Sequence, residues 1–179
     1  MADRWRRVRS LPRGDYRIFR VREDGYVHPE RDGEQSFMIL ECPDWVNVAA
    51  VTPERELVMI RQFRPGVGAT RLELPGGVIE EGEDPAAAAA RELREETGYA
   101  GSAPELLGTV EPNPAIQDNR CHSFLVREAR PAGPRAWDDA EFIETVLVPL
   151  DRLSALVDGG GVVHALMLVP LLRLLRTGL

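Results

Sequence analysis

The sequence has few of the features that mark disulfide-rich or membrane-spanning proteins. It contains only two cysteines, Cys42 and Cys121, which lack metal-type spacing and are too few for a disulfide scaffold. We therefore expect two free thiols in a reducing compartment. The most apolar stretch, residues 162–175, is interrupted by a histidine, a proline and an arginine. It is too short to span a bilayer, so we expect no membrane segment.

The sequence also has no excess of basic residues over acidic ones. The chain has 29 acidic and 22 basic residues, a net charge of -7. This balance argues against a nucleic-acid partner, because proteins that bind nucleic acids usually carry a basic surface. An acidic protein still binds a phosphate ligand when a cation mediates the contact. The first 16 residues are basic but lack the apolar segment of a secretory signal, so we expect a cytoplasmic location.

The length of 179 residues suits one domain with its own core, and we find no internal repeat or long linker. We therefore expect a single domain over residues 1–179. Apolar or alternating runs predict strands, and a turn is expected at 23–25, where Asp-Gly is a hairpin signal. The predicted strands are residues 16–21, 36–42, 46–51, 57–63, 71–74, 106–110, 121–126 and 142–148.

Helices are predicted at 85–97, 151–157 and 163–175. The first is the clearest: Asp84 is a good N-cap, Pro85 suits the first helical position, and Gly98 suits a left-handed residue after the last turn. Because strands and helices do not alternate regularly, we expect an α+β fold with a mixed sheet and helices packed on it.

Three carboxylates stand close together on this first helix. Glu95 and Glu96 follow Glu92 by three and four residues, so the three side chains share one face. Each close pair of like charges costs about 0.2–0.5 kcal/mol in an isolated helix. Oxygen ligands of this kind suit Mg²⁺ or Mn²⁺. The alternative is a solvated face whose acids pair with neighbouring arginines, as Arg91 and Glu95 can at four residues apart.

The wider spacing favours the metal site. Gly77 is followed after five residues by Glu83, and after seven more by Arg91-Glu92-Leu93-x-Glu95-Glu96-x-Gly98-Tyr99. At average residue frequencies this set arises on the order of once in 10⁹ starting points. Residues 77–99 resemble the signature of the Nudix hydrolase family. Tyr99 is a mild departure, since an aliphatic residue is commoner there, but any large apolar anchor suffices.

The resemblance implies a loop–helix–loop that carries a metal site on an α/β/α sandwich. It implies that Mg²⁺, or Mn²⁺ in its place, is bound by Glu92, Glu95, Glu96 and the backbone carbonyl of Gly76. It further implies structural roles within the signature: Glu83 and Arg91 as an ion pair that ties the loop to the helix, with metal binding by Glu83 also open, and Gly77 and Gly98 for backbone geometry.

The flanking residues narrow the substrate. Arg61-Gln62-Phe63-Arg64-Pro65 and Pro114, about 15 residues past the signature, resemble the branch of ADP-ribose and nucleoside diphosphate sugar pyrophosphatases. The resemblance covers roughly residues 35–175. It implies metal-dependent hydrolysis of the diphosphate bond of such a substrate to a nucleoside monophosphate and a sugar phosphate.

Candidate substrate-binding residues lie on these flanks. Guanidinium groups suit diphosphate oxygens, so Arg64 and, less strongly, Arg61 are candidates; the alternative for both is a surface ion pair. Arg120 is a candidate for the terminal sugar or phosphate, and Pro114 is a further candidate for substrate binding. Trp45 is a candidate for stacking on a base, although a core or interface role is equally open.

The general base is expected outside the signature. In the branch that this chain resembles, a carboxylate on a loop before a late strand takes the proton from the attacking water. The matching residue is Glu141, with Glu95 as the second choice; the alternative for Glu141 is an acidic surface loop. His164, in an apolar stretch, is expected to be a packing histidine. The N-terminal strands, about residues 10–50, resemble a β-arm that is exchanged in dimers, so we expect a homodimer.

Two other functions are open. The first is a Nudix hydrolase of another nucleoside diphosphate derivative, such as a dinucleotide cofactor or a nucleoside triphosphate. The second is a sensor that binds nucleotide sugars without cutting them. The complete set of signature carboxylates, and the lack of room for a DNA-binding domain, favour the enzyme.

Overall fold

The computed structural model describes residues 4–135 and 142–179. The chain forms two compact units. Unit 1 consists of Met1–Asp44 and Glu111–Arg120, and unit 2 consists of Trp45–Val110 and Cys121–Leu179. Each unit has a sheet of its own.

Unit 1 contains a three-stranded antiparallel sheet. Its strands are β1 (Arg6–Asp15), β2 (Arg20–Val27) and β3 (Glu34–Glu41), in the order β1-β2-β3. An N-terminal antiparallel arm was expected, but two local predictions are wrong. The strand expected at 16–21 begins with the turn between β1 and β2, where Arg17 has φ 69°. The turn expected at 23–25 lies inside β2.

The reason is that β2 is the central strand of this sheet. Asp24 is fully buried and accepts hydrogen bonds from Ser10 Oγ at 2.6 Å and from Arg22 Nε at 3.0 Å. Gly25 lies against Glu34, because a Cβ on the glycine would lie 2.2 Å from Glu34 Oε1. Pairing with β1 and β3 therefore outweighs the local turn preference of Asp-Gly.

The segment Glu111–Arg120 folds with unit 1 through contacts with β3 and the residues after it. Leu40 N–H donates to the carbonyl of Ile116 at 2.7 Å, and Arg120 N–H donates to Asp44 Oδ1 at 2.7 Å. Arg22 of β2 bonds to Asp118 Oδ2 at 2.6 Å. Arg120 and Pro114, both predicted to bind substrate, thus belong to this unit.

Unit 2 is built on a six-stranded mixed sheet with the order β11-β5-β4-β9-β8, in which β6 also pairs with β5. β4 pairs in parallel with β9, and the other neighbours pair antiparallel. The strands are β4 (Trp45–Val51), β5 (Glu56–Arg64), β6 (Ala69–Glu73), β8 (Glu105–Val110), β9 (Cys121–Val126) and β11 (Ile143–Pro149). A separate short pair joins β7 (Tyr99–Ala100) to β10 (Arg130–Pro131).

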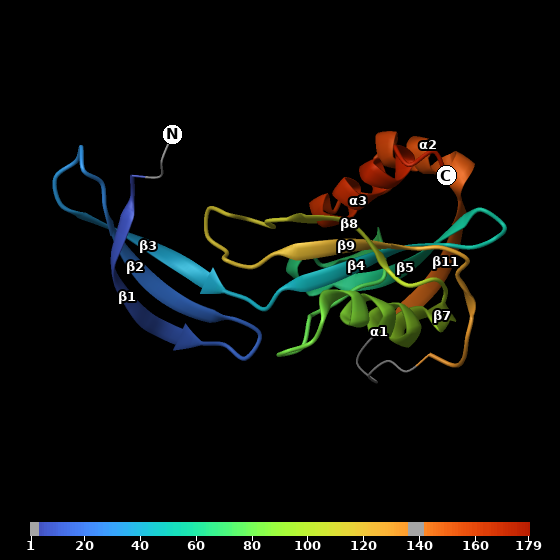
Figure 1. Ribbon diagram of the computed structural model, residues 1–179, viewed down its shortest axis with the longest axis horizontal. Helices are drawn as coiled ribbons and strands as arrows, with labels where there is room; N and C mark the ends of the chain where they lie inside the picture. The colour runs from blue at the N-terminus through green and yellow to red at the C-terminus, as the bar shows by residue number, and fades with distance from the viewer. Residues whose placement is uncertain (1–3, 136–141) are drawn as a thin grey trace. The chain divides into compact units, whose positions relative to one another are not determined.

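Helices cover both faces of this sheet (Figure 1). Helix α1 (Pro85–Thr97) lies on one face, and α3 (Ala165–Leu175) lies on the other with α2 (Leu153–Asp158) beside it. The 3-10 turn η1 (Pro65–Val67) follows β5, and η2 (Leu150–Arg152) precedes α2. The expected α+β fold, an α/β/α sandwich with a mixed sheet, is confirmed. No helix in the described part of the chain is long and apolar enough to cross a membrane.

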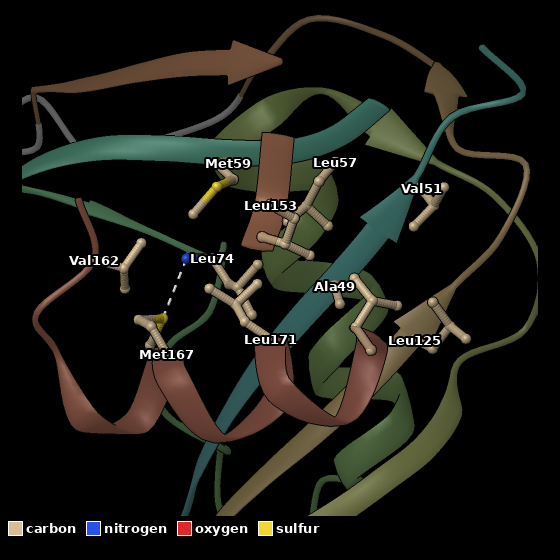
Figure 2. Packing of buried hydrophobic residues seen from close by; sticks show 11 residues of the cluster. Ala49, Val51, Leu57, Met59, Leu74, Leu125, Leu153, Val162, Met167 and Leu171 are labelled. Carbon is tan, nitrogen blue, oxygen red and sulfur yellow. Dashed lines mark hydrogen bonds between the residues drawn. The ribbon is translucent and has the colours of Figure 1, made fainter. Parts of the chain in front are cut away.

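The alternation of β-strand side chains divides the core into two clusters. On β4, Val48 and Ala50 pack with Leu93 of α1, whereas Ala49 and Val51 pack with Leu171 of α3. Figure 2 shows the second cluster, which Met167 joins through a contact of its sulfur with the backbone N–H of Leu74. Each fully buried leucine contributes about 1.5–3 kcal/mol, so the sheet is held from both sides.

Helix α1 begins and ends where the sequence predicts. Asp84 accepts hydrogen bonds from the N–H groups of Ala86 and Ala87 at 3.0 and 3.2 Å. Gly98 has φ 74°, and a Cβ there would lie 2.6 Å from the carbonyl oxygen of Gly133. Glycine is therefore needed at this helix end both for the left-handed conformation and for space.

Candidate active site

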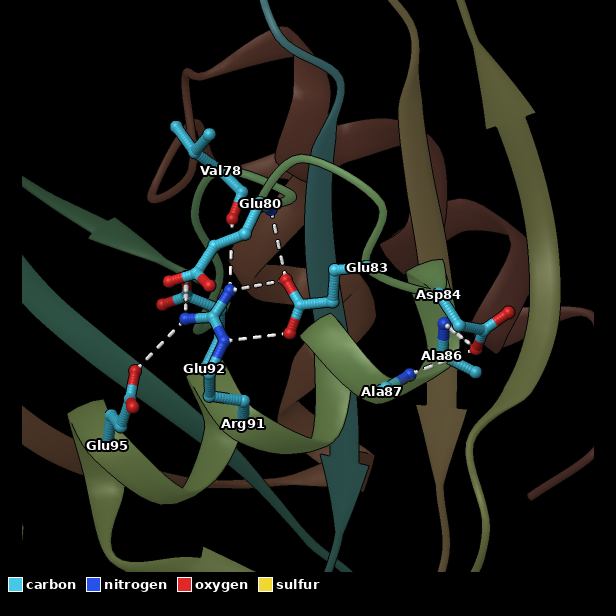
Figure 3. A network of polar contacts seen from close by, with 9 residues as sticks. All are labelled: Val78, Glu80, Glu83, Asp84, Ala86, Ala87, Arg91, Glu92 and Glu95. Carbon is cyan, nitrogen blue, oxygen red and sulfur yellow. Dashed lines mark hydrogen bonds and ion pairs between the residues drawn. The ribbon is translucent and has the colours of Figure 1, made fainter.

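Arg91 is the centre of a charge cluster on α1 (Figure 3). Its Nε and Nη2 atoms each donate to the carboxylate of Glu83 at 2.9 Å. Its Nη1 atom donates to Glu92 Oε1 at 2.8 Å and to Glu95 Oε2 at 3.1 Å. One guanidinium thus pairs with three carboxylates, and its bonds to Glu83 tie the loop before α1 to the helix.

The loop carboxylate stays charged at low pH. Hydrogen bonds from Arg91, and from the backbone N–H of Glu80, lower the pKa of Glu83 from 4.5 to about 2. Arg91 Nη2 also donates to the carbonyl of Val78 at 3.1 Å, which adds a second link to the loop. The pairing of Glu83 with Arg91 that the sequence predicts is therefore present in the structure.

Glu96 lies on the buried side of the helix and contacts the loop that precedes the signature. Its side chain is buried, and its Oε2 atom accepts a hydrogen bond from the N–H of Gly76 at 2.8 Å. A Cβ on Gly76 would lie 2.2 Å from the carbonyl oxygen of Val46, and a Cβ on Gly77 would lie 2.6 Å from Glu92 Oε1. The two glycines therefore allow this loop to pass close to β4 and to the carboxylate helix.

The three signature acids of α1 have different partners in this structure, so their metal binding stays a prediction. Across residues 4–135 and 142–179, no three His, Cys, Asp or Glu side chains are arranged to hold a metal ion. Glu92 and Glu95 converge on Arg91, whereas Glu96 bonds to Gly76. The physical reason is that the guanidinium supplies the positive charge that the crowded acids need.

The residues nevertheless fit a hard divalent cation. The donor set is made of carboxylate oxygens, which Mg²⁺ and Mn²⁺ prefer. Oxygens of Glu92 and Glu95 already lie about a hydrogen-bond length from one cationic nitrogen, Arg91 Nη1.

The two candidate phosphate-binding arginines of β5 point in opposite directions. Alternation along the strand places Arg61 on the face of Leu57 and Met59, which pack with α3. It places Arg64 on the face of Val58, which packs with α1. At the end of β5, Arg64 lines a pocket together with Glu73 and with His164, which precedes α3.

Both arginines form ion pairs. Arg61 lies 3.3 Å from Glu144, and both side chains are at least half exposed. Arg64 donates from Nε and Nη2 to Glu73 Oε2 at 3.1 and 2.6 Å. Glu73 is 1% exposed, and the Arg64 side chain is 38% exposed.

Glu73 and His164 were not predicted from the sequence as site residues. Nδ1 of His164 lies 3.2 Å from Glu73 Oε1. Burial would raise the pKa of Glu73, but its contacts with His164 and Arg64 outweigh burial and lower the pKa to about 2. His164 lies just before α3 and not inside the helix, and its expected role in packing stays a prediction. The one available signal was an acid between two apolar residues, Leu72 and Leu74, on a short strand.

The remaining candidates are spread over the chain. Trp45 begins β4, is half buried and forms a bridge with Val78. Arg120 is exposed and follows Asn119, whose side-chain amide donates to the carbonyl of Pro43 at 2.9 Å. Glu141, the expected general base, lies outside the described residues.

Comparisons with known proteins agree with this geometry. Residues 43–166 match the family model of the NUDIX domain. The chain is 36% identical over 128 residues to an ADP-ribose pyrophosphatase of Bacillus subtilis (strain 168), a match that covers 71% of this chain and 69% of that protein. It is 37% identical over 110 residues to an ADP-sugar pyrophosphatase of Mus musculus, with 59% of this chain and 50% of that protein covered. The chain thus spans about half to two thirds of the length of these relatives.

A solved structure shares the fold. The crystal structure of an ADP compounds hydrolase superposes with a TM-score of 0.86 at 18% sequence identity, over 98% of this chain and 94% of that one. The family match covers more than half of the chain and includes every signature residue from Gly77 to Tyr99. The chain therefore belongs to the Nudix family.

Proposed function

We propose that this protein is a metal-dependent pyrophosphohydrolase that cuts the diphosphate bond of ADP-ribose or a similar nucleoside diphosphate sugar. The products are a nucleoside monophosphate and a sugar phosphate. The observation that carries the proposal is the arrangement on α1, where Glu92 and Glu95 converge on one cationic nitrogen and Glu96 bonds to the Gly76 loop. The names of the Bacillus subtilis and mouse relatives support the substrate class.

The metal site is proposed at Glu92, Glu95, Glu96 and the backbone carbonyl of Gly76. Mg²⁺ is the expected ion, and Mn²⁺ is expected to substitute for it. When bound, the ion neutralises charge that develops on the diphosphate and lowers the pKa of a water molecule. Arg91 offsets the repulsion among the acids and keeps the loop on the helix through Glu83.

The other residues of the chain have the following proposed roles. Arg64 binds the diphosphate, which its partial exposure and its place in the lining of a pocket support. Arg120, Pro114 and Trp45 contact the substrate. Arg61 is a weaker candidate, because it lies on the other face of β5.

A carboxylate removes the proton from the attacking water, and we propose Glu141 for this role, with Glu95 as the alternative. A homodimer formed through the N-terminal strands and a cytoplasmic location also stay predictions from the sequence. Light scattering of the purified protein measures its mass in solution, and the mass of a single chain would contradict the homodimer.

The experiment that tests the activity is a substrate panel with Mg²⁺. ADP-ribose, GDP-mannose, UDP-glucose, NADH and a nucleoside triphosphate are compared by kcat/KM, with products separated by chromatography. We expect the highest value for a nucleoside diphosphate sugar, with a monophosphate and a sugar phosphate as products. A preference for NADH or the triphosphate would favour another Nudix activity, and binding without turnover would favour a sensor.

A further inference from the structure

A pocket of about 440 Å³ lies in unit 2 where the end of β5, the turn η1, the strand β6 and the residues that begin α3 meet. Its polar lining consists of Arg64, Arg71, Glu73 and His164. Glu73 is the buried member of this set, with 1% of its side chain exposed. The burial of this carboxylate needs a reason, because burying an acid is costly unless the acid is paired.

The contacts of Glu73 supply that reason. One of its oxygens binds both Nε and Nη2 of Arg64, and the other lies 3.2 Å from His164 Nδ1. A guanidinium held through two N–H groups has its plane and direction set, unlike an arginine that extends into water. Glu73 thus joins β5, β6 and the start of α3 around one guanidinium.

Glu73 also lies only a few residues before the loop that contacts the carboxylate helix. Glu73 precedes Gly76 by three residues, which span at most about 11 Å between Cα atoms. The N–H of Gly76 bonds to Glu96 on α1. The segment 73–76 therefore bonds to Arg64 through Glu73 and to Glu96 through Gly76.

We propose that Glu73 is a positioning residue that aims the Arg64 guanidinium at the diphosphate of the substrate, and that His164 holds Glu73 in place. This inference rests on the proposed function and adds two residues that act on the substrate only through Arg64. The negative charge of Glu73 repels a diphosphate, which works against binding. Because Glu73 is buried and its charge is matched by Arg64, orientation outweighs repulsion.

The test is a double-mutant cycle between Glu73→Gln and Arg64→Ala. Glu73→Gln is expected to raise KM for ADP-ribose about tenfold, while kcat changes by less than about twofold. Kd for ADP-ribose without metal, measured by calorimetry, is expected to rise by the same factor. In the Arg64→Ala background, Glu73→Gln is expected to add nothing to Kd, because the group that it orients is gone.

Two further variants sharpen this test. His164→Asn is expected to raise KM by about twofold, because it removes only the outer contact of Glu73. Glu105→Gln is the matched control, since Glu105 pairs with Arg127 at 3.4 Å on the exposed surface of the same unit. This control is expected to leave KM and Kd unchanged.

An unchanged or lowered KM in folded Glu73→Gln protein would overturn the proposal, as would an equal effect of Glu73→Gln with and without Arg64. Should Glu73→Gln not fold, Glu73→Asp keeps the charge and shortens the reach. An intermediate rise in KM then supports the proposal, and a wild-type KM overturns it. If the wild-type protein hydrolyses no substrate in the panel, the proposed function is wrong. The Kd for ADP-ribose without metal still tests the role of Glu73 in that case.

Discussion

Two arginines each hold three carboxylates, one in each unit of the molecule. Arg91 binds Glu83, Glu92 and Glu95, all within eight residues of it along the chain. Arg22 binds Asp24, Glu41 and Asp118, and the last of these is 96 residues away. Both arginines fasten a loop: Arg91 holds the loop before α1, and Arg22 holds the segment Glu111–Arg120 on its sheet.

The two fastened segments are expected to serve different steps of catalysis. The loop held by Arg91 belongs to the proposed metal site, so disturbing it should change kcat. The segment held by Arg22 carries Pro114 and Arg120, for which we propose substrate contacts, so disturbing it should change KM. The two clusters can therefore be separated by kinetics.

The largest effect on kcat is expected for a change of Glu96, which lies on α1 near the residues that Arg91 binds. Glu96→Gln keeps an oxygen that accepts from Gly76 N–H but removes one charge from the proposed metal site. We expect kcat with ADP-ribose and saturating Mg²⁺ to fall on the order of a hundredfold or more. The melting temperature should stay within roughly 2–4 °C of the wild type. Turnover close to that of the wild type in a folded variant would count against this site.

A smaller loss is expected when the centre of the cluster is removed. Arg91→Ala leaves three carboxylates close together and releases the loop from the helix, so kcat should fall about tenfold and the melting temperature should drop. Arg127→Ala, which removes an exposed pair with Glu105, is the control. If Arg91→Ala changed only KM, the assignment of this cluster to the metal site would be wrong.

In unit 1 the expected effect is on KM. Asp118→Asn removes the ion pair with Arg22, whose atoms lie 2.6 Å apart, and loosens the segment that carries Pro114 and Arg120. We expect KM for ADP-ribose to rise about threefold with kcat unchanged. Glu41→Gln breaks the pair of Arg22 with Glu41, whose atoms lie 2.8 Å apart, and leaves the ion pair of Arg22 with Asp118 in place. Equal effects of the two changes would show that the segment has no special role.

The smallest effect concerns acid stability. Glu83 and Glu23 both have a pKa of about 2, lowered from 4.5 by arginine hydrogen bonds, from Arg91 for Glu83 and from Arg9 and Arg13 for Glu23. A carboxylate with a lowered pKa stabilises the fold above pH 4.5, and this stabilisation is lost as the pH falls towards 2. Glu83→Gln and Glu23→Gln should each have a lower free energy of unfolding than the wild type at neutral pH. Both differences should shrink as the pH falls from 4.5 towards 2.

Thermal melts without metal, from pH 7 to pH 2, measure these deficits. We expect only Glu83→Gln to lower activity, since Glu23 lies in the sheet of unit 1. A deficit of Glu83→Gln that grew as the pH fell would contradict its pairing with Arg91.

Much of unit 2 and of the signature was predictable because the determinants are local. The caps of α1, the pair of Glu83 with Arg91 and the strand patterns all act within about a dozen residues, and the fold class and the family are confirmed. The arrangement of the three signature carboxylates was harder to predict, since Arg91 binds Glu92 and Glu95 whereas Gly76 N–H donates to Glu96. The roles of Arg64, Arg61, Arg120, Pro114, Trp45 and Glu141 stay predictions.

By itself, the sequence determined the signature helix, its two ends and the charges on its surface, since helix caps and neighbouring charges need no distant partner. The tertiary structure decided which face of β5 each arginine occupies, that Glu73 is buried beneath Arg64, and that Asp24 and Gly25 lie in a central strand instead of a turn. It also decided that residues 111–120 fold with the N-terminal sheet. These outcomes depend on strand pairing and ion pairs between residues far apart in the chain, where long-range burial outweighs local preference.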